Sequence, residues 1–212
     1  MTKFSTLFTY QVKKFAKAHH LTSHLFWTLL ASSIALPLIA PLEQIAKLGP
    51  MFFLASLAPA ILALSDVLLY PDQESGDLDF ALMHFGATSL ALAKFSAASL
   101  FVIISLLLCM PFFAIFYNLN FFSCAVLFFC SACLSLQSVA LAMLLAAICC
   151  YFAKRAMIFC SIVLPFIIPM LLCCGMFLEF PSFSLALILF GTLLLTAASS
   201  LLLSGFLLDN IS

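Results

Sequence analysis

Residues Tyr70 to Lys94 read YPDQESGDLDFALMHFGATSLALAK, and they form the one long interval beyond the N-terminal arm that interrupts membrane-compatible sequence. The interval holds half of the eight acidic residues of the chain, namely Asp72, Glu74, Asp77 and Asp79. An apolar stripe with the i, i+3, i+4, i+7 spacing of one helical face follows, made of Leu78, Ala81, Leu82 and Phe85. We therefore predict a short amphipathic helix from Ser75 to Phe85, lying outside the bilayer.

The charge at the front of this segment supports the same interpretation. Acidic groups are stabilised by the positive end of the helix dipole, and Ser75 and Asp77 are both candidates for the N-cap. The alternative is a solvated loop that joins two membrane helices, and the segment alone does not separate the two.

The composition of the whole chain identifies a polytopic membrane protein. The 212 residues are 66% hydrophobic and 8% charged, with a mean hydropathy of +1.29, and a soluble domain cannot cover so much apolar surface with so few polar groups. Long unbroken apolar runs favour helices over a closed barrel. The net charge is zero, so nothing points to nucleic acid as a partner.

The N-terminal arm, residues 1–24, has the pattern of a helix that lies in the membrane interface. Lysines occupy one side and apolar residues form a stripe on the other. The lysines are Lys3, Lys13, Lys14 and Lys17, and the stripe is Phe4, Leu7, Phe8, Val12 and Phe15. A cleaved signal peptide is the alternative, but the basic region is long and the following apolar run continues as a full span.

A spanning helix needs about 20 apolar residues, and the chain offers six such spans. They are expected at about residues 25–40, 48–70, 95–117, 121–149, 157–178 and 182–207. Proline removes a backbone donor and kinks or breaks a helix. We therefore expect a break at Pro37 near the outer end of the first span, and a kink or unwound turn at Pro165 and Pro169 near the middle of the fifth.

The distribution of basic residues sets the orientation. With the N-terminus inside, the arm, Lys94, Lys154 and Arg155 place seven of the eight basic residues on the inner side, and Lys47 alone lies outside. This asymmetry predicts six spans with both termini in the cytoplasm, and it puts the acidic amphipathic helix on the cytoplasmic face.

The sequence carries no arrangement typical of catalysis or of metal binding. It has no paired intramembrane carboxylates and no Gly-rich phosphate loop, so any ATP must be hydrolysed by another chain. Clustered histidines at the membrane entry, His19, His20 and His24, could act as haem ligands, although interfacial histidines are usually amphipathic anchors. The nine cysteines lie in or beside apolar runs and are most simply small apolar side chains.

Several elements in order resemble the CcmB family, the membrane subunit of the haem exporter of cytochrome c maturation, which is an ABC-type permease. They are the broken end of the first span at residues 35–41, Gly49-Pro50, the segment Asp72 to Asp79 that is similar to the family's D-x-x-x-G-x-L-E, Lys94, Pro111, Lys154-Arg155, and Leu164-Pro165-x-x-x-Pro169. The resemblance covers nearly the whole chain, and the last motif is its most specific part.

The sequence also departs from the family pattern. Asp79 stands where the family usually has Glu, Leu68, Leu69 and Tyr70 replace a basic residue, and residues 85–88 replace a Pro-rich turn. These changes bear on the detailed geometry of the contact that the resemblance implies with a separate ATP-hydrolysing subunit.

The resemblance implies a non-catalytic permease of the bacterial inner membrane. It implies a separate ATP-binding cassette subunit, with two copies of each in the complex, and further haem-handling membrane proteins. The acidic helix is then the coupling helix that contacts the ATPase, through Asp72, Glu74, Gly76, Asp77, Leu78, Asp79 and Leu82. The complex either exports haem or drives release of a haem-loaded chaperone from a neighbouring subunit, and this chain is expected to bind no cofactor of its own.

Two other classes of function remain open at this stage. A self-contained secondary transporter or channel needs ion sites at mid-membrane, and Asp66 is the one candidate. An integral membrane enzyme acting on lipid or isoprenoid needs acidic or histidine clusters at the interface, and the carboxylates of residues 72–79 are the only such group.

Overall fold

The regular structure of the chain is helical throughout the part that the computed structural model describes, residues 3–17, 26–31, 34, 42–152 and 164–210. The elements in chain order are α1 (Lys3–Lys17), α3 (Leu42–Leu62), α4 (Ser65–Leu68), α5 (Tyr70–Ser75), α6 (Asp77–Phe85), α7 (Ala87–Phe116), α8 (Phe121–Phe152), the 3-10 turn η1 (Leu164–Phe166), α10 (Ile168–Glu179) and α11 (Phe183–Asp209). The predicted all-α class is confirmed.

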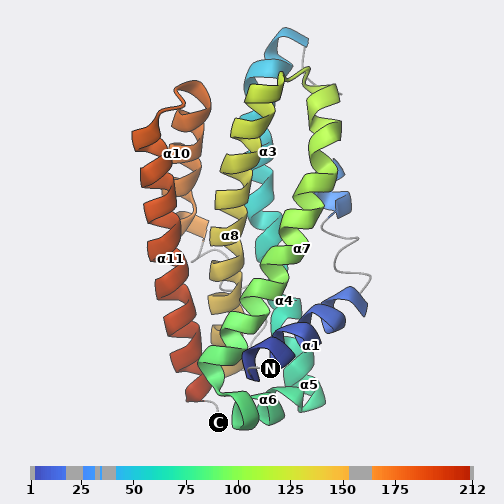
Figure 1. Ribbon diagram of the computed structural model, residues 1–212, viewed down its shortest axis with the longest axis vertical. Helices are drawn as coiled ribbons and strands as arrows, with labels where there is room; N and C mark the ends of the chain where they lie inside the picture. Colours follow the sequence, from blue (N-terminus) through green and yellow to red (C-terminus); the bar gives the residue numbers. More distant parts are fainter. Residues whose placement is uncertain (1–2, 18–25, 32–33, 35–41, 153–163, 211–212) are drawn as a thin grey trace.

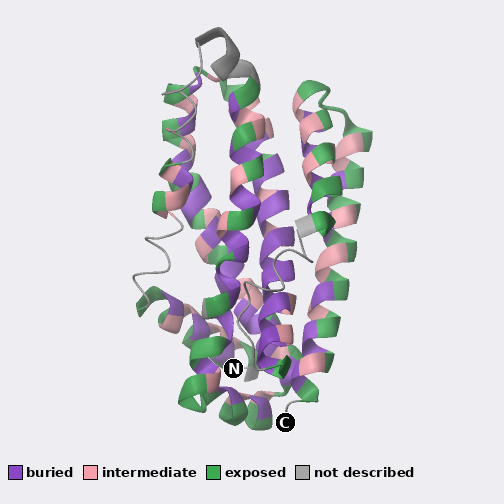
Figure 2. Ribbon diagram, turned by 180° about the vertical axis from the view of Figure 1, so that it is seen from behind, coloured by how far each residue is buried: buried purple, intermediate pink, exposed green. Residues whose placement is uncertain are grey.

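Helix α8 is the centre of the bundle (Figure 1). It contacts α3, α7, α10 and α11, and 83% of its most apolar 18-residue window is buried. In α11 the corresponding buried share is 17%, and the exposed side chains there are large apolar ones such as Leu195 and Phe206. Figure 2 shows this contrast between a buried centre and an exposed periphery. An apolar outer surface of this kind suits a bundle surrounded by lipid.

Three helices of the described chain are long and apolar enough to cross a membrane, namely α7, α8 and α11. Two shorter apolar helices accompany them, residues Leu48–Leu62 of α3 and Ile168–Glu179. These five contain or overlap the expected spans from the second to the sixth. Of the first expected span, residues 26–31 and 34 are described and helical, and the predicted break at Pro37 lies outside the described residues.

The proline pair of the fifth span lies where the helix changes form. Pro165 belongs to the 3-10 turn η1, and Pro169 is in the first turn of α10, where a missing N–H leaves no helical bond unmade. The amide of Gln137, buried in α8, donates from Nε2 to the carbonyl oxygen of Phe166 at 3.3 Å. An irregular turn is therefore present at the prolines, and a side chain of the central helix satisfies one of its carbonyls.

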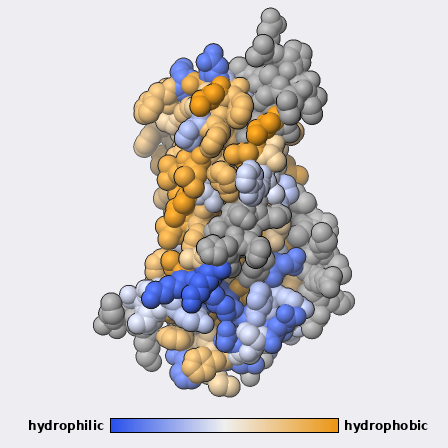
Figure 3. All heavy atoms as spheres, turned by 90° about the vertical axis from the view of Figure 1, so that its right-hand side faces the viewer, coloured by the Kyte–Doolittle hydropathy of each residue, from blue (hydrophilic) through white to orange (hydrophobic). Residues whose placement is uncertain are grey.

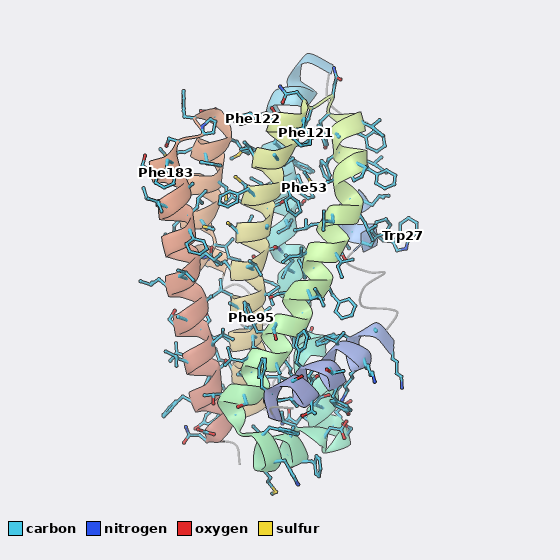
Figure 4. All side chains as sticks on the ribbon, in the orientation of Figure 1. Trp27, Phe53, Phe95, Phe121, Phe122 and Phe183 are labelled. Atoms are coloured by element: carbon cyan, nitrogen blue, oxygen red, sulfur yellow. The ribbon has the colours of Figure 1, made fainter. Side chains whose placement is uncertain are left out.

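Aromatic rings join α3 to α7 in the half of the bundle farther from α6. The rings of Phe53 and Phe113 lie 3.9 Å apart between centroids, and Phe113 stacks on Tyr117 at 5.3 Å. All three side chains are buried, and Figure 4 shows Phe53 directed into the bundle. Phe121, Phe122 and Phe183, also labelled there, lie at the end of the bundle opposite α6.

The predicted helix from Ser75 to Phe85 is present as α6, which begins two residues later at Asp77, and the separate helix α5 precedes it. Gly76, with φ +75°, ends α5 and precedes α6, because this left-handed conformation stops the helical ladder. Neither Ser75 nor Asp77 is the N-cap residue of α6, since Gly76 holds that position, but the Ser75 hydroxyl accepts a hydrogen bond from the Asp77 N–H at 3.5 Å. Helix α7 begins directly afterwards at Ala87, so Lys94 lies inside a helix and not in a loop.

Candidate functional site

The polar end of the bundle is built from α1, α5 and α6. These helices lie across the ends of the long helices, at the same end as the final turn of α11 (Figure 1). Figure 3 shows hydrophilic side chains gathered over this end, beneath a mainly hydrophobic body. Helix α1 packs on α7 and α6 through its apolar stripe, in which Leu7 and Phe15 are buried. The predicted amphipathic N-terminal helix is thus present over residues 3–17.

Helix α6 has one buried face and one exposed face. Leu78 and Leu82 are 1% and 7% exposed and join the main apolar core. Phe80 and Met83 are 62% and 82% exposed, and the ring of Phe80 stacks on His84 with centroids 4.1 Å apart. A helix that anchors itself with leucines while exposing two large apolar side chains is a surface suited to a protein partner.

Four charged side chains form a network beneath α6. Asp72 of α5 accepts one hydrogen bond from Lys14 of α1 and another from Lys94 of α7. The Lys94 Nζ also donates to the carbonyl oxygen of Leu68, and Lys14 Nζ is 3.0 Å from Asp77 Oδ2. The side chains of Lys94 and Asp72 are 2% and 8% exposed. Three separate helices and the start of α6 therefore meet at a single carboxylate and its neighbours.

The electrostatics of the exposed arm follow from these contacts. The hydrogen bond and the charge of Lys14 hold the pKa of Asp77 below its usual value. Partial burial acts to lower the pKa of Lys14, but the hydrogen bonds and charges of Asp72 and Asp77 outweigh it, and the pKa lies above its ordinary value. Both groups are charged at neutral pH, so the Lys14–Asp77 contact is an ion pair.

A groove of about 320 Å³ separates α1 from α6. The network lines one part of it through Lys14, Asp72 and Asp77, and the rest is lined by Thr6 and Gln11 and by apolar or aromatic side chains. The latter include Leu7, Tyr10, Phe80, Ala81 and Phe85. The exposed face of α6 and the groove adjoin through Phe80, so they form one continuous surface.

The predicted contact residues divide into two groups. Glu74, Gly76, Asp77 and Asp79 are exposed, whereas Asp72, Leu78 and Leu82 face inward. Asp72 therefore has internal partners instead of a free outward face.

Two features of this end were not predicted from the sequence. Phe80 and Met83 were missed as surface residues. They are not part of the apolar stripe of residues 78, 81, 82 and 85, and this position off the stripe indicated that they face outward. The pairing of Lys94 with Asp72 was also missed, because the loop predicted before the third span hid the helical position of Lys94.

Other candidate sites find less support in the described residues. No group of three or more His, Cys, Asp or Glu side chains in that part of the chain could hold a metal ion. Among the cysteines described there, seven are free thiols, namely Cys109, Cys124, Cys130, Cys133, Cys150, Cys173 and Cys174. His19, His20 and His24, the turn Lys154-Arg155 and Cys160 lie outside the described residues. Asp66 lies in the short helix α4 and is exposed.

A larger cavity, about 490 Å³, opens near the other end of the bundle. Its walls come from the middle of α3, the start of α8 and α10 from Leu172 onward, and Glu179 is the charged residue among its lining. The lining is mainly apolar, with two methionines, Met51 and Met176. Nothing in it resembles a site for a small polar substrate.

Comparison with known proteins gives a family match and two relatives. A family model described as "CcmB protein" matches residues 3–209. Over 178 residues the chain is 25% identical to an uncharacterized protein of Rickettsia prowazekii (strain Madrid E), in a match that covers 84% of this chain and 83% of the relative. Over 179 residues it is 28% identical to an uncharacterized protein of Rickettsia conorii (strain ATCC VR-613 / Malish 7), with the same two shares.

Proposed function

The chain belongs to the CcmB family, and from this premise we propose that it is the non-catalytic permease subunit of an ATP-driven haem exporter complex for c-type cytochrome assembly. It works with a separate ATP-binding subunit, in a complex that holds two copies of each and further haem-handling membrane proteins. ATP is bound and hydrolysed by the partner, and this chain converts the partner's motion into a rearrangement of its membrane helices.

The observation that carries the proposal is the exposed face of α6. A docking surface needs large apolar side chains that a partner can bury, surrounded by polar groups that fix the orientation. Phe80 and Met83 supply the first, and Glu74, Asp77 and Asp79 supply an acidic surround. We propose that these five residues contact the ATP-binding subunit, and that Leu78 and Leu82 hold α6 against the bundle.

The topology that goes with this function has six spans, both termini in the cytoplasm, and α6 on the cytoplasmic face of the inner membrane. The positions of α1, α6 and the last turn of α11 at one end of the bundle support it. Membrane-impermeant labelling of a reporter residue at Met83 in intact spheroplasts tests this arrangement. Labelling without permeabilisation contradicts it.

The cargo is handled in one of two ways, by passage of haem through the spans or by release of a haem-loaded chaperone from a neighbouring subunit. The described spans hold few charged groups, and no group of three or more His, Cys, Asp or Glu side chains in the described residues could hold a metal ion. This supports the second way, in which the permease transmits force and does not contact the haem.

Co-purification with the ATP-binding subunit tests the docking surface. Phe80→Ser with Met83→Ser removes the two apolar anchors from exposed positions, so the bundle keeps its stability while the partner is lost. The matched control is Phe121→Ser with Phe183→Ser, which removes two exposed rings, 91% and 80% exposed, from the opposite end. Equal recovery of the partner with both double variants rules out α6 as the docking element.

A second test separates this function from a self-contained secondary transporter or channel. Such a transporter requires an intramembrane ion site, for which Asp66 is the candidate. We expect Asp66→Asn to leave cytochrome c maturation within about twofold of wild type, whereas Gly76→Pro with Asp79→Lys abolishes it. Loss of function with Asp66→Asn alone favours the transporter.

A further inference from the structure

The segment from α5 to α7 is closed into a loop by one ion pair. Helix α6 is joined to α5 through Gly76 and to α7 through Gly86, which have φ values of +75° and +78°. Both glycines are exposed, and a β-carbon placed on either would have no neighbour within 4 Å. The pair of Asp72 and Lys94 joins α5 directly to the second turn of α7, outside both glycines.

The Asp72–Lys94 pair is buried, and burial of a charged group costs free energy. Lys94 is 2% exposed in a helix of membrane-spanning length. A buried ammonium is tolerated when a counter-charge and further acceptors surround it, and Asp72 and the Leu68 carbonyl supply these. Such a pair can often be replaced by apolar residues without loss of stability, so stability alone does not explain it.

The contacts of α5 and α6 make the Asp72–Lys94 pair a connection between the α5–α6 segment and the long helix α7. Helix α5 also reaches the central helix, since Gln73 Nε2 donates to the Cys150 carbonyl oxygen at 3.5 Å. Helix α6 is anchored by Leu78 and Leu82, and it contacts α5 and α7. With the ion pair in place, α5, α6 and the start of α7 form a closed unit, and displacement of α6 must move α7.

We infer that the Asp72–Lys94 ion pair is the joint that transmits movement of the docked α6 to the membrane helix α7, with both residues acting as positioning residues that the ATP-binding partner does not contact. This inference rests on the proposed function. Lys14 holds α1 against the same carboxylate, and its second ion pair, with Asp77, does not depend on Asp72.

The test separates stability from coupling. Asp72→Asn with Lys94→Met removes both charges, and the double variant has no unpaired buried charge because Lys14 retains Asp77. We expect wild-type thermal stability, wild-type recovery of the ATP-binding subunit, and about a tenfold loss of ATP-dependent cytochrome c maturation, within the usual range of coupling between sites. The control is Lys13→Met, which removes an exposed lysine of α1 and leaves all three readouts unchanged.

Wild-type maturation by a stable double variant overturns the inference and leaves the proposed function intact, since the variant still binds its partner. Failure of the unaltered chain to bind an ATP-binding subunit contradicts the proposed function instead. The two failures are therefore distinguishable in one set of preparations.

A distance measurement on the otherwise unaltered complex covers the case in which the double variant does not fold. Genetically encoded spin labels at the exposed positions Tyr70 of α5 and Leu92 of α7 lie outside the docking surface and avoid the nine native cysteines. A working joint keeps the label-to-label distance the same with and without ATP. An ATP-dependent change in this distance shows that α5 and α7 move independently, and it overturns the inference.

Discussion

The backbone of α3 passes so close to Tyr117 at Gly49 that a β-carbon there would lie 2.1 Å from Cε1 of the ring. Tyr117 is 1% exposed and stacks on Phe113, so the ring has no free space to enter. We expect Gly49→Ala to lower the free energy of unfolding by about 1 to 3 kcal/mol, as overpacking does. Thermal unfolding in detergent measures it.

A rescue variant makes this prediction specific. Gly49→Ala combined with Tyr117→Leu should be more stable than Gly49→Ala alone, because the smaller side chain vacates the position of the ring. If Tyr117→Leu instead lowers the stability of the Gly49→Ala variant further, the close approach of Gly49 to the Tyr117 ring is not the cause of the destabilisation.

Gly76 is needed for its backbone conformation and not for space. Its φ is +75° and nothing lies within 4 Å of an added β-carbon, so Gly76→Ala should destabilise by about 1 to 2 kcal/mol through left-handed strain alone. Gly191 offers the matched control, because it has open space inside α11 without a positive φ. Gly191→Ala should stabilise by about 0.5 to 1 kcal/mol. Equal shifts in melting temperature for the two variants contradict this account.

The Lys14–Asp77 ion pair predicts a defined pH window. Asp77 has a lowered pKa, so its contribution is complete above the ordinary value of 3.8 and is lost as pH falls through the lowered pKa. Lys14 has a raised pKa, so its contribution is complete below 10.5 and is lost as pH rises through the raised pKa. The difference in melting temperature between wild type and Asp77→Asn, which leaves the Lys14–Asp72 contact in place, should thus be constant from about pH 5 to 9 and shrink outside that range. A constant difference down to pH 2 excludes the pair as its source.

Single substitutions in the network should differ in severity. Asp72→Asn leaves Lys94 buried without its counter-charge and should cost about 3 to 5 kcal/mol. Lys14→Met removes a partly exposed charge, whose pairing is screened by solvent, and should cost at most about 1 kcal/mol. Chemical unfolding of the two purified variants measures the order. The reverse order would mean that α1, and not α7, is the main partner of Asp72.

The sequence predicted the parts of this molecule that depend on periodicity and apolar length. The membrane-length helices at residues 87–116, 121–152 and 183–209 follow from unbroken apolar runs, and α1 follows from its two-sided pattern. The Leu78 and Leu82 anchors follow from their spacing. Each of these features is local, so the sequence holds its signal within a few turns.

The parts that were missed depend on contacts between distant residues. The Asp72–Lys94 pair joins residues 22 positions apart. No local sequence pattern predicts that a lysine will be buried beside a carboxylate. Helix α5 was missed because residues 71–74 were not predicted to be helical, and the positive φ of Gly76 that ends α5 cannot be read from the sequence. The charges of residues 72 to 79 were treated as one exposed group, whereas packing turns Asp72 inward and leaves the others outside.

Helix α7 has 30 residues, which at 1.5 Å per residue gives it a length of about 45 Å, against roughly 30 Å for the hydrocarbon layer. The excess can lift the α5–α6 end above the lipid headgroups. The proposed ATP-binding subunit would then reach α6 without contacting the membrane surface. A thicker bilayer would first shorten the distance between α6 and the headgroups, before it disturbed any contact inside the bundle.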